Sequence, residues 1–342
     1  MSDIKVNNIQ SLSGTNGPVI SGTVEMNSTG AMSLPRGDTA YRGGRGRGIF
    51  GGGFVGPNIR YNTIEYITIS TQSNALDFGD LTEESDRGGC CASSVRGLFQ
   101  GGIKSPGNNT NTISYVTISS TGNAFDFGDI SNVSNRFTGS SCSNNTRGLY
   151  GGGYNPALQT QIDLSIIASL GNTISFGDLT VPRRNISSLA SPTRGVWTGG
   201  YNQGATYKKT IDYVTISTEG TAKDFGDLTS ARHIAASVSS NTRGLTAGGY
   251  TTGFVNVIDY ITIASIGDAI DFGDLSAVKG FMGGCSNSIR GVFGGGDNPA
   301  LASTIEFVTI ASTGNASSFG SLSLAKTQLH NGQCSDSHGG LG

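Results

Sequence analysis

Five cysteines and three histidines are the residues of this chain that could form a metal or redox centre. Three cysteines each lie five residues before an Arg-Gly pair: Cys91, Cys142 and Cys285. The same position elsewhere holds Leu189 and Val238, which indicates a small buried apolar site. Cys90 and Cys91 are adjacent, which is not zinc-ligand spacing. We therefore predict buried free thiols, no metal and no cofactor.

The histidines, His233, His330 and His338, have no recurring acidic partner. A copper-radical oxidase would need several histidines with a Cys–Tyr pair, and the Asp-box pattern of sialidases is missing. We find no residues to assign to catalysis and expect a protein that is not an enzyme.

A carboxylate recurs after Phe-Gly, at Asp80, Asp129, Asp178, Asp227 and Asp274, with Ser321 in the sixth copy. Calcium is one interpretation, but each loop offers one or two carboxylates rather than the alternating acidic ligands of a calcium loop. Asp or Ser at the end of a strand more often bonds to backbone N–H groups of a turn. We favour that structural role.

Arginine also recurs, at six equivalent Arg-Gly positions: Arg47, Arg96, Arg147, Arg194, Arg243 and Arg290. The favoured interpretation is structural, with each guanidinium bonded to carbonyls of its own or the next repeat. An anion-binding ring is the alternative. Residues 42–48 also resemble a short RGG box and residues 36–38 form an RGD tripeptide, but such short matches arise by chance.

These recurrences belong to one repeat. Phe-Gly-(Asp/Ser)-(Leu/Ile) starts at Phe78, Phe127, Phe176, Phe225, Phe272 and Phe319, at spacings of 49, 49, 49, 47 and 47 residues. The Arg-Gly string and a Thr/Ile/Tyr string recur six times in the same order. Each unit holds four strand candidates rich in β-branched, aromatic or small residues. The units lie near residues 47–95, 96–146, 147–193, 194–242, 243–289 and 290–342.

Unit length, strand number and a Gly-Gly pair after the second strand are typical of a β-propeller blade. The repeat resembles the kelch repeat, although Phe takes the place of that family's usual Trp near the fourth strand. We predict an all-β, six-bladed propeller of four-stranded blades over residues 45–342. The first-strand string occurs seven times, once more than the other strings, with one copy at residues 34–44 and another at 324–337. We expect the C-terminal copy to close the ring.

The loops between the second and third strands vary most and are rich in Tyr, Asn, Gly and Pro. All six emerge on one face of a propeller, where aromatic and amide side chains suit a saccharide or protein surface. Ordinary surface loops are the alternative. The binding residues predicted in them are Phe54, Tyr61, Tyr154, Tyr201, Tyr207 and Tyr250.

Composition excludes several other classes. Charged residues make up 13% of the 342 and the net charge is −2, unlike a disordered chain or a general nucleic-acid binder. No apolar run is long enough for a membrane span, and the start lacks the apolar segment of a secretory signal. The odd number of cysteines indicates folding in a reducing cytoplasm.

Residues 1–44 do not share the repeat. The opening Ile4-Lys5-Val6-Asn7 and the later segment from Leu34 to Arg42 resemble the start of tail-fibre and related virion proteins of tailed bacteriophages, especially those of marine cyanobacteria. Asp38 stands where that group often has Thr. The resemblance implies an arm that docks on other virion proteins, with oligomerisation as one option.

Two classes of function remain. The first is a non-enzymatic virion protein that carries the propeller outward to a host-surface saccharide or protein, either on the tail or as a decoration or fibre of the head. The second is a cellular kelch-type lectin or enzyme. The absence of a signal and of catalytic residues favours the first, made in the host cytoplasm and located in the virion.

Overall fold

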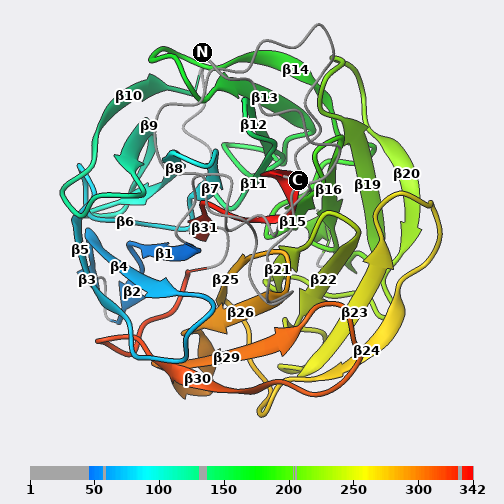
Figure 1. Ribbon diagram of the computed structural model, residues 1–342. Coiled ribbons are helices and arrows are strands. Elements are labelled where there is room, and N and C mark those ends of the chain that lie inside the picture. Colours follow the sequence, from blue (N-terminus) through cyan, green and yellow to red (C-terminus); the bar gives the residue numbers. More distant parts are fainter. Residues whose placement is uncertain are drawn as a thin grey trace, which may run out of the picture. The chain divides into compact units, whose positions relative to one another are not determined.

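A computed structural model describes residues 46–56, 59–130, 137–202, 204, 206–329 and 333–341. These residues form a closed ring of six β-sheets, each a blade of a propeller (Figure 1). The prediction of an all-β, six-bladed propeller with four-stranded blades is confirmed. The expected arm, residues 1–44, the RGD match and His330 lie outside the described residues, as do residues 42–45 of the RGG match, whereas its Arg47 and Gly48 are part of a strand.

In every blade the strands follow one another from the axis outward. Blade 1 contains β31 (Gln333–Ser335), β1 (Arg47–Gly51), β4 (Thr63–Thr68) and β5 (Leu76–Asp80) in that order. Blade 2 contains β7 (Gly89–Ala92), β8 (Arg96–Lys104), β9 (Asn108–Thr117) and β10 (Phe125–Asp129), with β6 (Ser85–Asp86) paired to β8. Blade 3 contains β11 (Ser140–Ser143), β12 (Arg147–Gly151), β13 (Gln161–Ile166) and β14 (Ile174–Asp178).

Blade 4 contains β15 (Ser187–Ala190), β16 (Arg194–Thr198), β19 (Thr210–Thr215) and β20 (Lys223–Asp227). Blade 5 contains β21 (Ala236–Ser239), β22 (Arg243–Ala247), β23 (Val257–Thr262) and β24 (Ile270–Asp274). Blade 6 contains β25 (Gly283–Ser286), β26 (Arg290–Gly294), β29 (Thr304–Thr309) and β30 (Ser317–Ser321). Short ladders occupy three outer loops: β2 (Phe54–Val55) with β3 (Ile59–Arg60), β17 (Tyr201–Asn202) with β18 (Thr206–Tyr207), and β27 (Asp297–Asn298) with β28 (Ala300–Leu301).

The C-terminal strand completes the first blade. β31 pairs antiparallel with β1, with Cys334 opposite Ile49. The six inner strands contact one another around the axis in the order β7, β11, β15, β21, β25 and β31, and β31 contacts β7 again. The ring is thus closed by pairing the last strand of the sequence with the first, which gives blade 1 an inner strand like those of the other five blades.

The residues after β31 do not repeat the second strand, although His338-Gly339-Gly340 resembles its beginning. That place in blade 1 is already taken by β1. The residues instead form a short 3-10 helix, η2 (Gly339–Leu341), which touches β11, β15 and β21 beside the axis (Figure 1). His338 is hydrogen-bonded to the carbonyl oxygen of Ala92 at 2.8 Å, so the tail is tied to blade 2.

Small residues let the blades approach closely at the axis. The glycine of each Arg-Gly pair faces one inner-strand side chain of the preceding blade. At Gly195 an added Cβ would lie 2.8 Å from the Sγ of Cys142, and at Gly244 it would lie 2.5 Å from Leu189. Cys91, Cys142 and Cys285 are buried free thiols in this position, as predicted. Burial raises the pKa of Cys142 to about 12, so its thiol stays protonated at neutral pH.

The recurring arginines join neighbouring blades. Each guanidinium donates to a carbonyl of the following blade, as Arg194 does to Ile263 at 2.7 Å and Arg290, in blade 6, to Ser70 of blade 1 at 2.8 Å. Five of the six also lie over an aromatic ring of their own blade at 4.6–4.8 Å: Arg47, Arg96, Arg194, Arg243 and Arg290. Because these contacts recur around the ring, the arginines act as links between blades. We call the end of the ring that carries them the arginine face.

The Phe-Gly-Asp string also makes inter-blade contacts. In all six copies the glycine lies against the turn of the next blade, and in four of them it has a positive φ; at Gly79 (φ 143°) an added Cβ would be 2.4 Å from the Gly122 carbonyl oxygen. The following N–H donates to a side chain of that turn, as Asp80 does to Asn123 at 3.1 Å. The bond therefore runs opposite to the predicted one: the backbone N–H of the string donates to a side chain of the turn, and the role predicted for the Asp carboxylate is not what these contacts show.

Among the described residues, four blades contain a buried ion pair between the segment that precedes the inner strand and the third strand. The pairs are Arg183–Asp212, Arg232–Asp259, Lys279–Glu306 and Lys326–Glu65. Burial alone would raise the pKa of Glu65, but the charge and hydrogen bond of Lys326, together with hydrogen bonds from Ser323, lower it overall. In these blades the ion pair attaches the segment that precedes the inner strand to the third strand of the sheet. Sequence reasoning did not identify them.

Candidate functional site

One end of the ring carries both the loops between second and third strands and the segments that precede the inner strands. This end is called the loop face. The two chain segments are joined in every blade by an antiparallel bridge, which blade 2 extends to a second pair, Ser85–Lys104. The bridges are Phe54–Thr327, Ile103–Asp86, Tyr154–Phe137, Tyr201–Arg184, Tyr250–His233 and Asp297–Gly280. Each bridge therefore brings one residue of each segment to the same height on its blade, and every bridge except Asp297–Gly280 presents two side chains there.

In blades 3, 4 and 5 these side chains and their neighbours form one continuous group, called the aromatic row: Phe137, Tyr154, Arg184, Tyr201, Tyr207, His233, Tyr250 and Phe254. Every member is half-buried, so each offers part of its side chain to solvent. The blades are adjacent in the ring, which makes the row an uninterrupted surface feature.

Contacts within the row hold its rings in place. The Arg184 guanidinium lies over the Tyr154 ring at 4.9 Å and over the Tyr201 ring at 5.1 Å, which connects blade 3 to blade 4. The His233 ring is stacked on Tyr207 with centroids 4.6 Å apart and 9° between planes, which connects blade 4 to blade 5. Tyr250 packs edge-on against His233 at 5.8 Å.

His233 is neutral at physiological pH. Burial, with the positive charge of Arg184 as a second cause, lowers the pKa of His233 to about 4. Its Nδ1 lies 3.3 Å from the Asn185 side-chain nitrogen. The ring therefore acts as an aromatic surface rather than as a charge, and it has a fixed orientation.

A ring of backbone hydrogen bonds supports the row from the axial side. The residue after each bridge has a left-handed backbone conformation: Arg87, Thr138, Asn185, Ile234, Phe281 and Gln328, at φ of 54–60°. In this conformation the N–H of Asn185 donates to the carbonyl oxygen of Thr138 at 2.8 Å. The N–H of Ile234 likewise donates to the carbonyl oxygen of Asn185 at 3.0 Å. Such φ values are rare for β-branched residues, and strained backbone of this kind clusters at functional sites.

Four of the six predicted binding residues lie in the aromatic row: Tyr154, Tyr201, Tyr207 and Tyr250. The other two, Phe54 and Tyr61, are in blade 1, across the ring from blade 4. Phe54 lies under the guanidinium of Arg60 at 5.6 Å instead. The structure therefore brings four predicted residues together and leaves two apart.

Sequence reasoning missed Phe137, Arg184, His233 and Phe254. Phe254 lies in one of the variable loops, but the other three precede the inner strands. The signal that could have found them is topological, because the chain leaves the fourth strand on the same face as the loop between the second and third strands.

The loop in blade 2 differs from the expected one. The sequence predicts a loop over residues 103–111, but β8 continues to Lys104 and β9 begins at Asn108, so the two strands form an extended hairpin. Isoleucine, asparagine and threonine in this segment favour strand pairing over an open loop, with Lys104 opposite Asn108. This hairpin borders a cavity of about 30 Å³.

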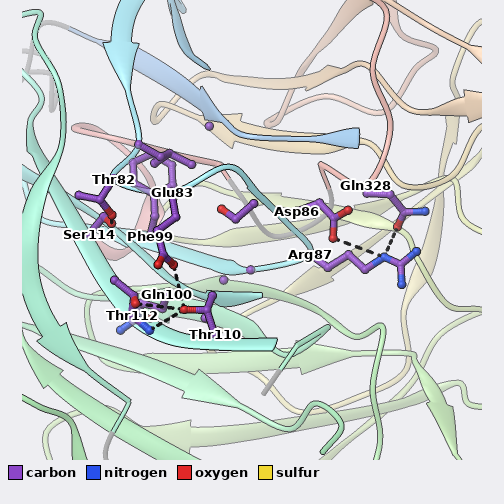
Figure 2. A pocket seen from close by; sticks show the side chains of 16 residues that line it. Thr82, Glu83, Asp86, Arg87, Phe99, Gln100, Thr110, Thr112, Ser114 and Gln328 are labelled. Atoms are coloured by element: carbon purple, nitrogen blue, oxygen red, sulfur yellow. Dashed lines mark hydrogen bonds and ion pairs between the residues drawn. The ribbon is translucent and has the colours of Figure 1, made fainter. Parts of the chain in front are cut away.

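Figure 2 shows that cavity, which is lined by Thr82, Gln100, Thr110 and Ser114 among other residues. Ser85 and Ser114 stand at the positions where blade 4 has Arg183 and Asp212. Loss of the two long side chains explains the space, which is enough for a water molecule. At its edge Arg87 lies between Asp86 and Gln328.

Two other hollows lie elsewhere on the ring. One of about 60 Å³ lies along the axis between the inner strands and is lined by serines, cysteines and His338. The other, of about 290 Å³, lies on blade 4 between Arg194 and Lys223. Within the described ranges no three His, Cys, Asp or Glu side chains are placed to hold a metal ion. None of the helices in the part of the chain that the structure describes is long and apolar enough to cross a membrane.

The chain is a six-bladed β-propeller whose loop face carries a row of ordered, half-buried aromatic side chains. No model of a known protein family matches the sequence, and no curated protein is similar to it.

Proposed function

We propose that the propeller is a binding module that holds a saccharide on the aromatic row, and that it acts by binding rather than by catalysis. The observation that supports this most is the row itself, in which tyrosine rings of three adjacent blades are held half-exposed by ring and cation contacts. Aromatic rings bind the apolar face of a sugar while hydroxyl groups bond its edges. Because the rings are already ordered, binding costs little side-chain entropy.

We propose further that the chain is a virion structural protein of a tailed bacteriophage, tail-fibre-like or otherwise tail-associated, with a head decoration or head fibre as the alternative. This part rests on the resemblance of residues 1–44 to the start of phage fibre proteins. In this proposal the arm attaches to other virion proteins and the propeller presents the aromatic row to the host surface.

Binding of purified host-surface glycans to the full-length protein tests the first part. Tyr207→Ala removes the ring that stacks on His233, and we expect glycan binding to fall at least tenfold. Phe125→Ala is the matched control, because Phe125 is 64% exposed on β10 and lies outside the row. Equal binding by both variants and the wild type would reject the row as the binding site.

Removal of residues 1–44 tests the second part. A chain that begins at Arg45 should keep its fold and its glycan binding but fail to join phage particles. Fusion of residues 1–44 to an unrelated domain should carry that domain onto the particles. Normal incorporation of the shortened chain would show that the arm is not the anchor.

A further inference from the structure

Arg184 is the one cation of the aromatic row, and it differs sharply from the arginine before it. Arg183 is fully buried, 2.8 Å from Asp212, and donates to the carbonyl oxygens of Gly199 and Thr210. Arg184 is half-buried between two tyrosine rings, and its buried Nε has no hydrogen-bond partner among the described residues. No carboxylate of the described ranges lies within 4.0 Å of it.

The position of Arg184 is fixed by the backbone. Its N–H donates to the carbonyl of Tyr201 at 3.0 Å, and the N–H of Tyr201 donates to the carbonyl of Arg184 at 2.8 Å. The rings of Tyr154 and Tyr201 then confine the guanidinium from two sides. A guanidinium held in this way has little entropy still to lose, and its planar donors match an oxyanion.

The charges around Arg184 also favour an anion. Its positive charge lowers the pKa of His233 and, after burial and the charge of Arg60, that of Arg87. Arg60 and Arg87 share one carboxylate, Asp86, at 3.1 and 3.8 Å. The positive charge of Arg184 thus reaches both Arg87 and His233, while the nearby Asp86 carboxylate is already paired with two other arginines.

We infer that the saccharide bound by the row carries an acidic group, and that Arg184 binds this group while the tyrosine rings hold the sugar. The inference rests on the proposed function. A carboxylate, sulfate or phosphate presents the planar or tripodal oxygens that a guanidinium binds through two hydrogen bonds. The arginine thereby selects acidic over neutral sugars, and the tyrosines supply contact with either.

The experiment compares the full-length protein with matched oligosaccharides of one backbone in neutral, uronic-acid, sulfated and phosphorylated form. Wild type should bind at least one acidic form about tenfold more tightly than the neutral form, and this preference should shrink as salt rises. Arg184→Gln should abolish the preference. Because the variant also removes a contact that holds the Tyr154 and Tyr201 rings, binding of the neutral form should fall as well, but several-fold less than binding of the acidic form. The control Lys223→Gln removes an exposed cation from β20 and should change neither.

Arg184→Lys keeps the charge without the planar fork and should retain only part of the preference, which also shows that a folded row is present. Equal binding of neutral and acidic forms by the wild type would overturn the inference and leave the proposed function standing. Equal losses for all forms in Arg184→Gln, with an unchanged melting temperature, would also overturn it. Failure of the wild type to bind any of the glycans would reject both.

Discussion

At the scale of single residues, His233 makes the aromatic row sensitive to acid. Its pKa is lowered to about 4 by burial and by Arg184, whereas an unfolded histidine titrates near 6.5. The unfolded chain therefore binds a proton that the folded chain does not, and stability falls as pH drops from about 6.5 towards about 4. Above about pH 6.5 His233 is neutral in both the folded and the unfolded chain, so its titration no longer reduces stability.

We predict that nuclear magnetic resonance will place the His233 titration well below pH 6, and that Arg184→Gln will raise it. His233→Phe keeps a ring against Tyr207 and should make the melting temperature less sensitive to pH over that range. Since His338 is buried and its pKa is also lowered, the comparison is the difference between the wild type and the variant. A His233 titration near 6.5 in the folded protein would contradict this account.

Close packing at the axis gives a second prediction at this scale. Gly195→Ala should destabilise the fold, because its Cβ would lie 2.8 Å from the Sγ of Cys142. Truncation of the neighbour in Cys142→Ala removes that contact, so the double variant should be more stable than the sum of the single effects predicts. Chemical denaturation of the four proteins measures the coupling, and additive effects would show that the two side chains do not compete.

The cysteine sites could be predicted from the sequence because Cys, Leu and Val alternate at one position of the repeat. The aromatic row could be predicted only in part. Tyr201 and Tyr250 stand out in variable loops, but Arg184 and His233 come from segments whose side chains become neighbours of those loops only through the bridges. Their importance depends on a contact between distant parts of the sequence.

At the scale of elements, the buried ion pairs hold the returning chain against the third strand. Arg232 and Asp259 lie 2.9 Å apart with side chains 0% and 1% exposed. Asp259→Asn leaves the guanidinium buried without a counter-charge, and we predict a loss of about 3–5 kcal/mol of unfolding free energy. Denaturant titration measures this loss.

The double variant Arg232→Met with Asp259→Leu removes both charges and should recover most of the stability. Lys209→Ala is the control, because the Lys209–Asp227 pair is 57% and 37% exposed, and we expect no measurable change. A similar loss in the control and in Asp259→Asn would show that burial is not what makes the pair matter.

These pairs escaped prediction for a physical reason. Lys279 and Glu306 lie 27 residues apart, and each by itself has the composition of a surface position. The repeat identifies the strands because hydrophobic period and turn residues are local signals. It does not show which charged side chains turn inward.

At the scale of the whole molecule, the C-terminal strand closes the ring. Loss of residues 333–342 would remove Cys334 from its contact with Gly97 and leave β1 without its inner partner. We predict aggregation or loss of a single cooperative melting transition, because an exposed strand edge pairs with other chains. Calorimetry of a chain that ends at Gly332 checks this, and unchanged melting would contradict it.

Closure could be predicted from counting, since a ring with six copies of three strings and a surplus first strand has one place to fill. The 3-10 helix beyond that strand could not be predicted, because its residues resemble the start of a second strand and blade 1 already has one in β1. Removal of residues 1–44 should leave the melting temperature unchanged, which is the matched comparison for the C-terminal truncation.

The most direct test of the account is hydroxyl-radical footprinting of the full-length protein, free and bound to the surface polysaccharide of its host. Tyrosine side chains are half-buried at both ends of the blades: Tyr154, Tyr201, Tyr207 and Tyr250 on the loop face, and Tyr66, Tyr115, Tyr213 and Tyr260 beside the arginine face. We predict that binding protects the first four and leaves the second four unchanged. Protection of the second four, or equal labelling of both sets with and without the polysaccharide, would contradict the assignment of the aromatic row as the binding site.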